Sequence, residues 1–401
     1  MKAQKFFSLL KPLLVWSIVL PIVIELILHW TLNDLPNKLL NHTTGPIQRL
    51  GQYSKEKVMP SNYIAMLGDS NVYGFGPWLY DNSWSMGQPN FATHHLLNEN
   101  LGRDIMAFGY PGYGTLGSCL SMVSERGMFD RSWIWQNVEY PRHILVVFYE
   151  GNDLINNLHE IEQRGFNISL PLAEDSKTEI NQIIVKESEK LRSSWSVLDH
   201  SASWNIFVGL TENYLHEDKA TEEQTTSVSV EIPSYNPPQE SVEENVALIN
   251  GNRVSLGYCE GPALHLSVEE INLALETAKQ SLAFLRKCFS KSKIDLLYLP
   301  SSLSIYEFKN CALRPAPLKI KGETRNEVFY PADASKKNEW LRLELSSLSN
   351  SLGLGFIDTT PFLKEKARLH LLHGPRDPIH LNRKGYEFFS EAIIQQLETN
   401  F

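Results

Sequence analysis

Short apolar runs alternate with longer amphipathic stretches along most of the chain. Breakers such as Gly, Pro or Asp bound the apolar runs, which cover residues 63–67, 104–108, 143–148, 294–299 and 355–357. Bounded runs of this length are typical of parallel strands that are buried on both faces. Stretches at 268–290, 336–352 and 383–397 predict helices, and in the last of them the apolar residues recur at helical spacing. This alternation predicts a doubly wound α/β sheet.

The alternation stops between about residues 155 and 265. Much of this region is rich in Glu, Ser and Thr and is interrupted by Pro233, Pro237 and Pro238, so it has too little apolar surface to form core strands. Its earlier part, 180–198, has the pattern of an amphipathic helix. That helix would form either a lid over a site or a solvated appendage. We therefore predict an insertion that lies over one end of the sheet.

One long apolar run lies near the N-terminus, from Pro12 to Trp30, and Glu25 is its only ionised side chain. At about 1.5 Å per residue, a helix over this run would just span a hydrocarbon layer of roughly 30 Å. A cleaved signal peptide is the alternative, but the run is long for one and no small-residue cleavage site follows it. Since Glu25 lies near the outer end of the run, we expect it to snorkel to the interface; contact with a partner helix is the other interpretation.

The charges that flank this run predict its orientation and the domain order. Three lysines precede it, at positions 2, 5 and 11, and few basic residues follow, which predicts a cytoplasmic N-terminus. Residues 1–31 would then be the cytoplasmic end and transmembrane anchor. Residues 32–60, with several Pro and Gly among polar residues, would form a juxtamembrane stalk. Residues 61–401 would form an α/β domain outside the cytoplasm, on the periplasmic side or at the cell surface.

Composition narrows the possible partners. The chain of 401 residues is 42% hydrophobic and 21% charged, as in ordinary globular proteins, and its net charge of -9 argues against nucleic acid as a partner. The four cysteines, Cys119, Cys259, Cys288 and Cys311, show no CxxC or zinc-finger spacing, which argues against a metal bound through sulfur. A Cys288–Cys311 disulfide and buried free thiols both remain open.

Two separated segments carry residues that together could activate a nucleophile. Ser70 follows Gly68 and Asp69 in the turn after the first predicted strand, at the edge where open α/β sheets bind ligands. Asp377 and His380 stand three residues apart just before the last predicted helix. A serine hydroxyl needs a base, and a histidine needs a carboxylate that fixes its tautomer. A turn serine alone is more often structural, but this combination predicts a catalytic triad.

Two further loops follow predicted strands and offer oxyanion donors. The loop at 109–115 contains glycines that let a backbone N–H point at a substrate oxygen, and Gly112 stands at its centre. The loop after the third strand contains Asn152, whose side-chain amide is a donor. Each loop alone is more often a turn. Because the strand-end segments lie on the same rim of a parallel sheet, we expect them to converge.

With these four blocks the chain resembles the SGNH (GDSL-like) hydrolase family, in a membrane-anchored bacterial form. The matching segments are GDS at 68–70, GYPGYGT at 109–115, GND at 151–153 and DPIHLN at 377–382, and the looser resemblance covers about 60–155 and 265–401. Glu150 stands where the third block usually has a glycine, and Ala107 and Phe108 stand where the second commonly has an asparagine.

The resemblance implies a flavodoxin-like three-layer α/β/α sandwich with a mostly parallel sheet. It also implies ester hydrolysis through an acyl-serine intermediate, with no metal or other cofactor. The implied catalytic residues are Ser70, Asp377 and His380. The oxyanion would be held by the N–H groups of Ser70 and Gly112 and the amide of Asn152.

Other residues of the same blocks are candidates for substrate contact. These are Asp69, Asn71, Tyr110, Tyr113 and Asp153. Further aromatic side chains near the blocks would either stack on sugar rings or pack the core. In addition to Tyr110 and Tyr113, they are Tyr73, Phe75, Trp78, Tyr80 and Trp84.

Three classes of function follow from this pattern. The first is an esterase or O-deacetylase that acts on an acylated carbohydrate or lipid, and the second is an acyltransferase that passes the same acyl group to a polysaccharide. The third is a catalytically inactive carbohydrate-binding or assembly protein on the same fold. A metal-dependent hydrolase is disfavoured, since His94, His95, His370 and His373 form no HExxH or carboxylate-rich cluster and are expected on the surface.

Overall fold

Five parallel strands form the central sheet of the computed structural model, which describes residues 2–37, 40, 43, 45–74, 90–131, 138–167, 172–173, 175–196, 198–216, 245–320, 322–374 and 377–398. The strands are β1 (Ile64–Gly68), β2 (Ile105–Gly109), β3 (His143–Tyr149), β6 (Lys293–Leu299) and β10 (Gly355–Asp358). Their spatial order, β10-β6-β3-β1-β2, is the flavodoxin-like order. All five strands predicted from the sequence are confirmed.

Both faces of the sheet are buried, which explains the continuous apolar runs. Ala65 and Leu67 of β1 point into one core, while Ile64 and Met66 point into the other. Successive side chains of a strand alternate between faces, so a strand covered on both sides needs apolar residues throughout. The class predicted from the sequence, a three-layer α/β/α sandwich, is therefore confirmed.

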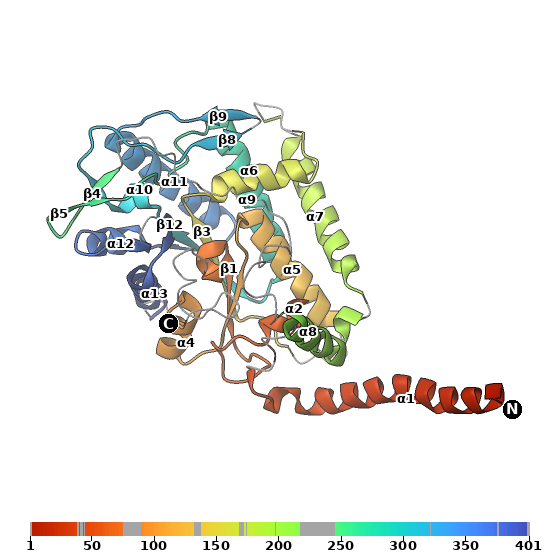
Figure 1. Cartoon of the computed structure of the whole chain (residues 1–401). Coiled ribbons are helices and arrows are strands. Elements are labelled where there is room, and N and C mark those ends of the chain that lie inside the picture. Colours follow the sequence, from red (N-terminus) through yellow and green to blue (C-terminus); the bar gives the residue numbers. More distant parts are fainter. Residues whose placement is uncertain are drawn as a thin grey trace.

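Helices cover the two faces of the sheet (Figure 1). One layer packs on the core that contains Leu67, and it consists of α5 (Thr115–Arg131), α6 (Asp153–Gln163), α7 (Ser176–Ser194), α9 (Val268–Cys288) and α11 (Pro331–Ser351). The other layer consists of α4 (Thr93–Leu101), α12 (Thr360–Ala367) and α13 (Arg383–Glu398). The helices predicted at 268–290, 336–352 and 383–397 correspond to α9, α11 and α13.

Short elements lie at the ends of the sandwich. They are the helices α3 (Ser70–Tyr73) and α10 (Ser302–Ile305), the antiparallel sheet of β4 (Val246–Ile249), β5 (Asn252–Ser255) and β7 (Glu307–Phe308), and the pairs β8 (Leu318–Ile320) with β9 (Glu323–Arg325) and β11 (His373–Gly374) with β12 (Asp377–Leu381). The remaining described helices are α1 (Lys2–Thr31), η1 (Leu32–Asp34), α2 (Gly45–Arg49), η5 (Leu198–His200) and α8 (Ala202–His216).

The predicted insertion is placed differently from the expectation. The helix expected at 180–198 is α7, which lies beside α5 (Figure 1). Its buried Ile180 and Ile184 pack in the same core as α5 and α9. It therefore belongs to the helical layer and is neither a lid nor a solvated appendage, because its apolar stripe finds a partner surface there. The polar stretch at 217–244, with Pro233, Pro237 and Pro238, lies outside the described residues.

The segment expected as a stalk packs on the domain instead. Leu40, Ile47, Leu50 and Val58 are buried in the core under α5. The side chain of Gln52 forms two hydrogen bonds of 2.8 Å with the backbone of Ala107, one donated and one accepted. The apolar residues of segment 32–60 are spaced too irregularly to predict a buried element. Polar side chains of the segment, such as Gln52, form hydrogen bonds with the backbone of the edge strand β2.

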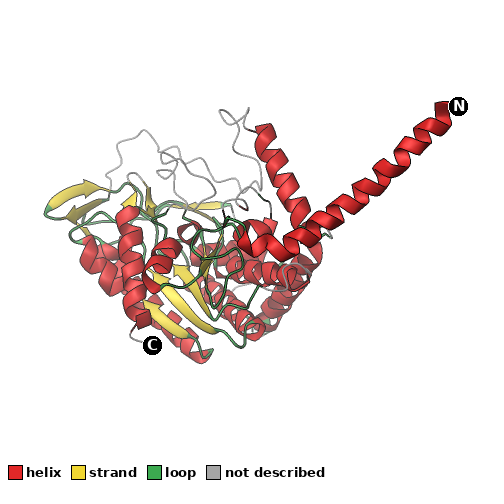
Figure 2. Cartoon of the chain, turned by 90° about the horizontal axis from the view of Figure 1, so that it is seen from below, coloured by secondary structure: helices red, strands yellow, loops and turns green. Residues whose placement is uncertain are grey.

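Helix α1 leaves the domain as a single long rod in both overall views (Figures 1 and 2). Within it and the turn that follows, Val15–Asp34 is long and apolar enough to span a membrane, and 12% of that window is buried. Glu25, expected to snorkel, is 8% exposed and accepts a hydrogen bond of 2.7 Å from the backbone N–H of Ala202. Glu25 therefore contacts a partner helix, α8, which is the alternative interpretation given for it above.

All four cysteines are free thiols, so the Cys288–Cys311 disulfide is not formed in this structure. Cys119 and Cys259 are buried free thiols, which was the alternative to a disulfide. Cys288 is half-buried and Cys311 is exposed. Cysteines of the buried kind behave as small apolar side chains.

Candidate active site

Ser70 is held in a tight turn between β1 and the short helix α3. Two glycines make this turn possible, because a Cβ on Gly68 would lie 2.5 Å from Val72 Cγ2 and one on Gly109 would lie 2.3 Å from the backbone N of Tyr73. The backbone of α3 therefore passes directly over the ends of β1 and β2. Ser70 is the first residue of α3, at the carboxyl edge of the sheet between β1 and β3, where the strand order reverses.

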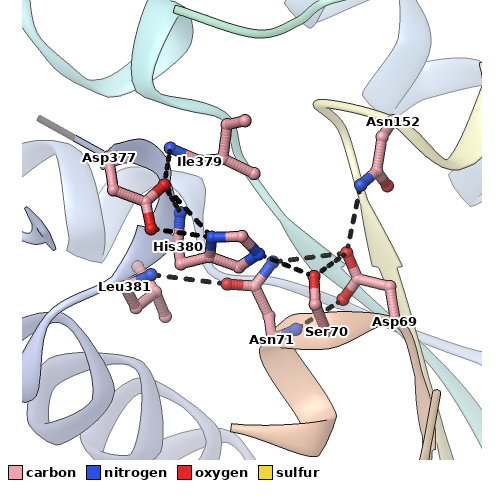
Figure 3. A network of polar contacts seen from close by, with 8 residues as sticks. All are labelled: Asp69, Ser70, Asn71, Asn152, Asp377, Ile379, His380 and Leu381. Atoms are coloured by element: carbon pink, nitrogen blue, oxygen red, sulfur yellow. Dashed lines mark hydrogen bonds and ion pairs between the residues drawn. The ribbon is translucent and has the colours of Figure 1, made fainter. Parts of the chain in front are cut away.

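His380 lies within hydrogen-bond distance of both other candidates (Figure 3). Its Nε2 is 2.9 Å from Ser70 Oγ, and its Nδ1 is 2.9 Å from Asp377 Oδ2. Asp377 and His380 belong to β12, which precedes α13 and pairs with β11, so both come from one short strand rather than an irregular loop. Residues far apart in the sequence thus form a hydrogen-bonded line of hydroxyl, imidazole and carboxylate.

The surroundings of His380 favour its protonated form. Burial lowers the pKa of His380, but the hydrogen bond and the negative charge of Asp377 outweigh burial, and the pKa is raised above its usual value. Asp69 and Glu260 contribute to the same rise through their charges. An imidazole in this setting accepts a proton readily, which is what a general base requires.

Asp69 joins the serine turn to the loop that follows β3. One carboxylate oxygen accepts a hydrogen bond of 2.9 Å from the backbone N–H of Asn71, and the other accepts one of 3.3 Å from the side-chain amide of Asn152 (Figure 3). Asn71 in turn accepts a hydrogen bond of 3.4 Å from the backbone N–H of Leu381. Asp69 and Asn71, which we expected to contact a substrate, are buried and connect the serine turn to the loop after β3 and to β12.

Gly112 lies exposed at the tip of the loop after β2, with a φ of 77° that favours glycine. The loop is fastened at both ends, because Tyr110 N–H donates a 3.0 Å hydrogen bond to Gly68 O and Gly114 N–H donates one of 2.8 Å to Glu160 Oε1. These contacts hold the loop beside the end of β1, next to the serine turn. The backbone N–H of Gly112 is therefore on a fixed loop at the open edge of the sheet.

Tyr110 packs between Arg49 and Tyr113, and the sequence did not point to the contact with Arg49. The guanidinium of Arg49 lies 4.3 Å from the centre of the Tyr110 ring, and Tyr113 stacks on that ring with 4.9 Å between centroids. Arg49 also donates a hydrogen bond of 2.9 Å to Ala107 O, and it pairs with Glu125, which accepts a hydrogen bond from the Tyr110 hydroxyl. Tyr110 and Tyr113, candidates for substrate contact, thus anchor the glycine loop from its inner side.

Glu150, which replaces the usual glycine of the third block, has a structural role. Its Oε2 accepts hydrogen bonds of 2.8 Å from Ser301 N–H and 2.6 Å from Ser301 Oγ, and its Oε1 accepts one from Asn338. The carboxylate therefore joins the ends of β3 and β6 to α11. Three donors satisfy this buried side chain, which would be costly to bury without hydrogen-bond partners.

Asp153 and Glu160 are buried below the loops. Glu160 accepts hydrogen bonds from the N–H groups of Gly114 and Gly117, at the first turn of α5, and burial raises its pKa to about 7. Burial raises the pKa of Asp153 well above its usual range as well, and Asp153 lies 3.4 Å from Thr115 Oγ1. Asp153 was expected to contact a substrate, but its burial against α5 does not fit that role.

Glu260 is a further acidic residue at the site that sequence reasoning missed. Burial raises its pKa to about 7, and its charge acts on His380, Asp69 and Asp377. Its buried Oε2 and the buried hydroxyl of Tyr149 have no hydrogen-bond partner among the described residues. Glu260 lies in an irregular segment after β5, and a single glutamate there carries no signal in the sequence.

The histidines expected on the surface are mostly inside the protein. His94, His95 and His373 are buried, and burial lowers the pKa of His95 and of His373 to about 4. His373 Nδ1 lies 3.0 Å from the hydroxyl of Tyr306. Because burial lowers their pKa values, these imidazoles are neutral near pH 7. Across the described ranges, His, Cys, Asp and Glu form no group that could hold a metal ion.

The aromatic side chains near the first block are only partly described. Tyr73 is half-buried at the end of α3, and its pKa is raised, chiefly by burial. Phe75, Trp78, Tyr80 and Trp84 lie outside the described residues.

Comparisons with known proteins give remote structural likenesses, among them the following two. One solved crystal structure is 10% identical in sequence, over 86% of this chain and 99% of its own, with a TM-score of 0.33. An acetyl xylan esterase (Est2A) from the rumen bacterium Butyrivibrio proteoclasticus is 9% identical, over 85% of this chain and 64% of its own, also with a TM-score of 0.33. No protein-family model and no curated protein matches the chain.

Proposed function

We propose that this protein is a serine esterase or O-deacetylase that cleaves acyl esters of a carbohydrate or lipid through an acyl-serine intermediate. The observation that carries the proposal is the continuous line of hydrogen bonds from Ser70 through His380 to Asp377. A serine hydroxyl is a poor nucleophile until a base removes its proton, and a carboxylate on the far nitrogen stabilises the imidazolium that forms.

In the proposed reaction, Ser70 Oγ attacks the carbonyl carbon of the ester while its proton passes to His380 Nε2. Asp377 stabilises the positive charge on the ring through the bond to Nδ1. When the tetrahedral intermediate collapses, the alcohol leaves with the proton from Nε2 and the acyl group stays on Ser70. Water then attacks the acyl-serine with His380 again as base, and the free acid leaves.

The negative charge on the carbonyl oxygen of that intermediate needs donors. We assign this role to the backbone N–H groups of Ser70 and Gly112 and to the side-chain amide of Asn152. Two features support the assignment, since Gly112 is exposed on a fixed loop and the Asn152 amide points toward the serine turn (Figure 3). Its present partner, Asp69, would keep the amide oriented until a substrate binds. In a well-studied protease, one such donor is worth about 10²–10³ in kcat.

We further propose that α1 anchors the protein in a membrane, with the N-terminus in the cytoplasm and the α/β domain outside. The length and apolar character of Val15–Asp34 and the lysines that precede it support this orientation. The substrate would then be an extracytoplasmic ester.

Labelling with a fluorophosphonate probe tests the proposed chemistry, because such probes react with activated serines. The full chain should be labelled, and it should hydrolyse p-nitrophenyl acetate with release of free acid. Ser70→Ala should abolish both, whereas Ser351→Ala, on the exposed face of α11, should abolish neither. A folded protein that neither labels nor turns over would contradict the proposal and favour a binding protein. Transfer of the acetyl group to an added sugar in place of free acid would instead indicate an acyltransferase.

A further inference from the structure

Glu25 connects the N-terminal helix to a second helix that follows much later in the chain. Its Oε1 accepts a hydrogen bond of 2.7 Å from Ala202 N–H, and its Oε2 accepts bonds of 2.9 Å from Ser203 N–H and 3.0 Å from Ser201 Oγ. The carboxylate thus satisfies two of the unpaired N–H groups at the start of α8 and lies at the positive end of the helix dipole. A charge inside an apolar run is stabilised by this arrangement, and α8 is held against α1.

Helix α8 has one face on the domain and one face bare. Ala202 and Asn205 are buried, and Ile206 packs at the border of the main core. On the other face, Trp204 is 42% exposed and Phe207 is 59% exposed, with their ring centroids 6.1 Å apart. From residue 202 to residue 211 the chain carries no ionisable side chain. Exposed aromatic pairs on an uncharged helix face are unusual at a surface that meets only water.

The start of α8 lies against α1, whose exposed apolar side chains continue past this contact. Glu25 precedes the end of α1 at Thr31 by six residues, which corresponds to about 9 Å along the helix axis. Exposed apolar side chains of α1 continue on both sides of this level, among them Ile22, Ile27 and Trp30. If α1 spans a bilayer, the start of α8 lies at the depth of the outer interface, where tryptophan and other aromatic side chains are favoured.

We propose that α8 is a second membrane contact, lying in the outer interface of the bilayer with Trp204 and Phe207 among the lipids. The proposal rests on the proposed anchoring by α1. The occupant is a lipid surface because the bare face is apolar and uncharged, and because it belongs to a helix whose start is bonded to α1, which is itself long enough to span. Two contacts joined by Glu25 hold the domain in one orientation on the membrane, whereas a single helix with a flexible stalk would let it rotate.

Site-specific photo-crosslinking in the full chain tests this proposal. Benzoylphenylalanine is introduced singly at positions 204, 207, 27 and 343, and each protein is reconstituted in vesicles of phosphatidylcholine and phosphatidylglycerol. Leu343 is the matched control, because it is 65% exposed and belongs to α11, a helix that lies apart from α1 (Figure 1). Position 27 reports whether α1 itself is in the bilayer. Mass spectrometry identifies what each position has captured.

The proposal predicts phospholipid adducts at positions 204, 207 and 27 and none at position 343. Adducts at position 27 but not at 204 or 207 would overturn the proposal while leaving the anchor intact. Capture of a second copy of the chain at position 207, without lipid, would overturn it as well and make this face a dimer contact. Lipid adducts at none of the positions would contradict the membrane anchor, and the proposal with it. The outcome does not depend on esterase activity.

Discussion

The protonation of His380 decides whether Ser70 can be activated. A base must be neutral to accept the serine proton, so activity is lost as pH falls through the pKa of His380. Because Asp377 raises that pKa, the loss should occur above the usual value for histidine, about 6.5. The pH dependence of kcat/KM therefore reports on the contact between His380 and Asp377.

Asp377→Asn removes the charge that raises the pKa of His380 and keeps the shape of the side chain. We expect kcat/KM to fall by about 10³–10⁴, as in the known triad, and the remaining acid limb to move to lower pH. The measurement is kcat/KM for p-nitrophenyl acetate from about pH 4 to about pH 9. An acid limb that stays in place would show that Asp377 does not act on the base.

Glu260→Gln tests the influence of a second carboxyl group. Its negative charge also raises the pKa of His380, though less than Asp377 does. The acid limb of kcat/KM should therefore shift to lower pH by a smaller amount, while the plateau at high pH stays within a few-fold of the original. Glu344→Gln, on the exposed surface of α11, is the control and should leave the profile unchanged. A profile identical to that of the unaltered protein would mean that Glu260 does not face the base.

Residue types and spacing pointed to the serine, the histidine and the aspartate, but not to Glu260 or Arg49. The first three stand in short segments whose spacing is itself informative. Glu260 is a single polar residue in an irregular segment and Arg49 ends the short helix α2, and the partners of both lie far away in the sequence. Such contacts form only when the chain folds, so no local sequence pattern predicts them.

Helix α2 and the segment after it form a structural support for the glycine loop. Arg49 connects α2 to the glycine loop, because it contacts Tyr110, Glu125 and the backbone of Ala107. It touches no reacting atom in the proposed mechanism and is a positioning residue. Its planar guanidinium stacks and donates in several directions at once, which a lysine ammonium does not reproduce.

Arg49→Lys should therefore lower kcat by roughly 10-fold, with a smaller change in KM, because a loosened loop misplaces the N–H of Gly112. Lys57→Ala, at an exposed cation of the same segment, is the matched control. The readout is the split between kcat and KM together with the melting temperature. If kcat falls only in proportion to a loss of folded protein, Arg49 is structural and does not position the loop.

The elements that the sequence predicted are those with a simple pattern. Strands covered on both faces are uniformly apolar, and α9 and α13 carry clean amphipathic stripes. Helix α5 gave no such signal, because it contains Gly117 and Gly127 and many small polar residues. A Cβ at Gly117 would lie 2.5 Å from Oε1 of Glu160, a carboxylate that two backbone N–H groups hold in place, and a Cβ at Gly127 would lie 2.7 Å from the side chain of Arg192. Tertiary contacts there override local propensity.

The order of the strands places the candidate site within the whole fold. Because β1 lies between β2 and β3, the turns that carry Ser70, Gly112 and Asn152 meet at one edge of the sheet. Alternation of strands and helices indicated the class of fold, but it does not determine which strands are neighbours, since that depends on contacts between distant segments. The family resemblance supplied the order that the pattern alone lacked.

The connection between anchor and domain was the main feature that the sequence did not predict. Residues 32–60 looked like a polar spacer with breakers, yet they pack under α5 and reach the glycine loop through Arg49. Together with the contact between Glu25 and α8, this packing attaches the domain directly to α1. In the proposed setting, the site would therefore be held at a fixed position above the membrane.

The most direct test of the account is to trap the acyl-enzyme. The full chain is mixed with an acetyl ester and quenched in acid, and the peptide that contains Ser70 is analysed by mass spectrometry. We predict that this peptide gains the mass of one acetyl group, and that an accompanying His380→Ala variant shows no gain. Ester hydrolysis without acetylation of Ser70, or acetylation of another residue in its place, would contradict the central claim that Ser70 is the nucleophile.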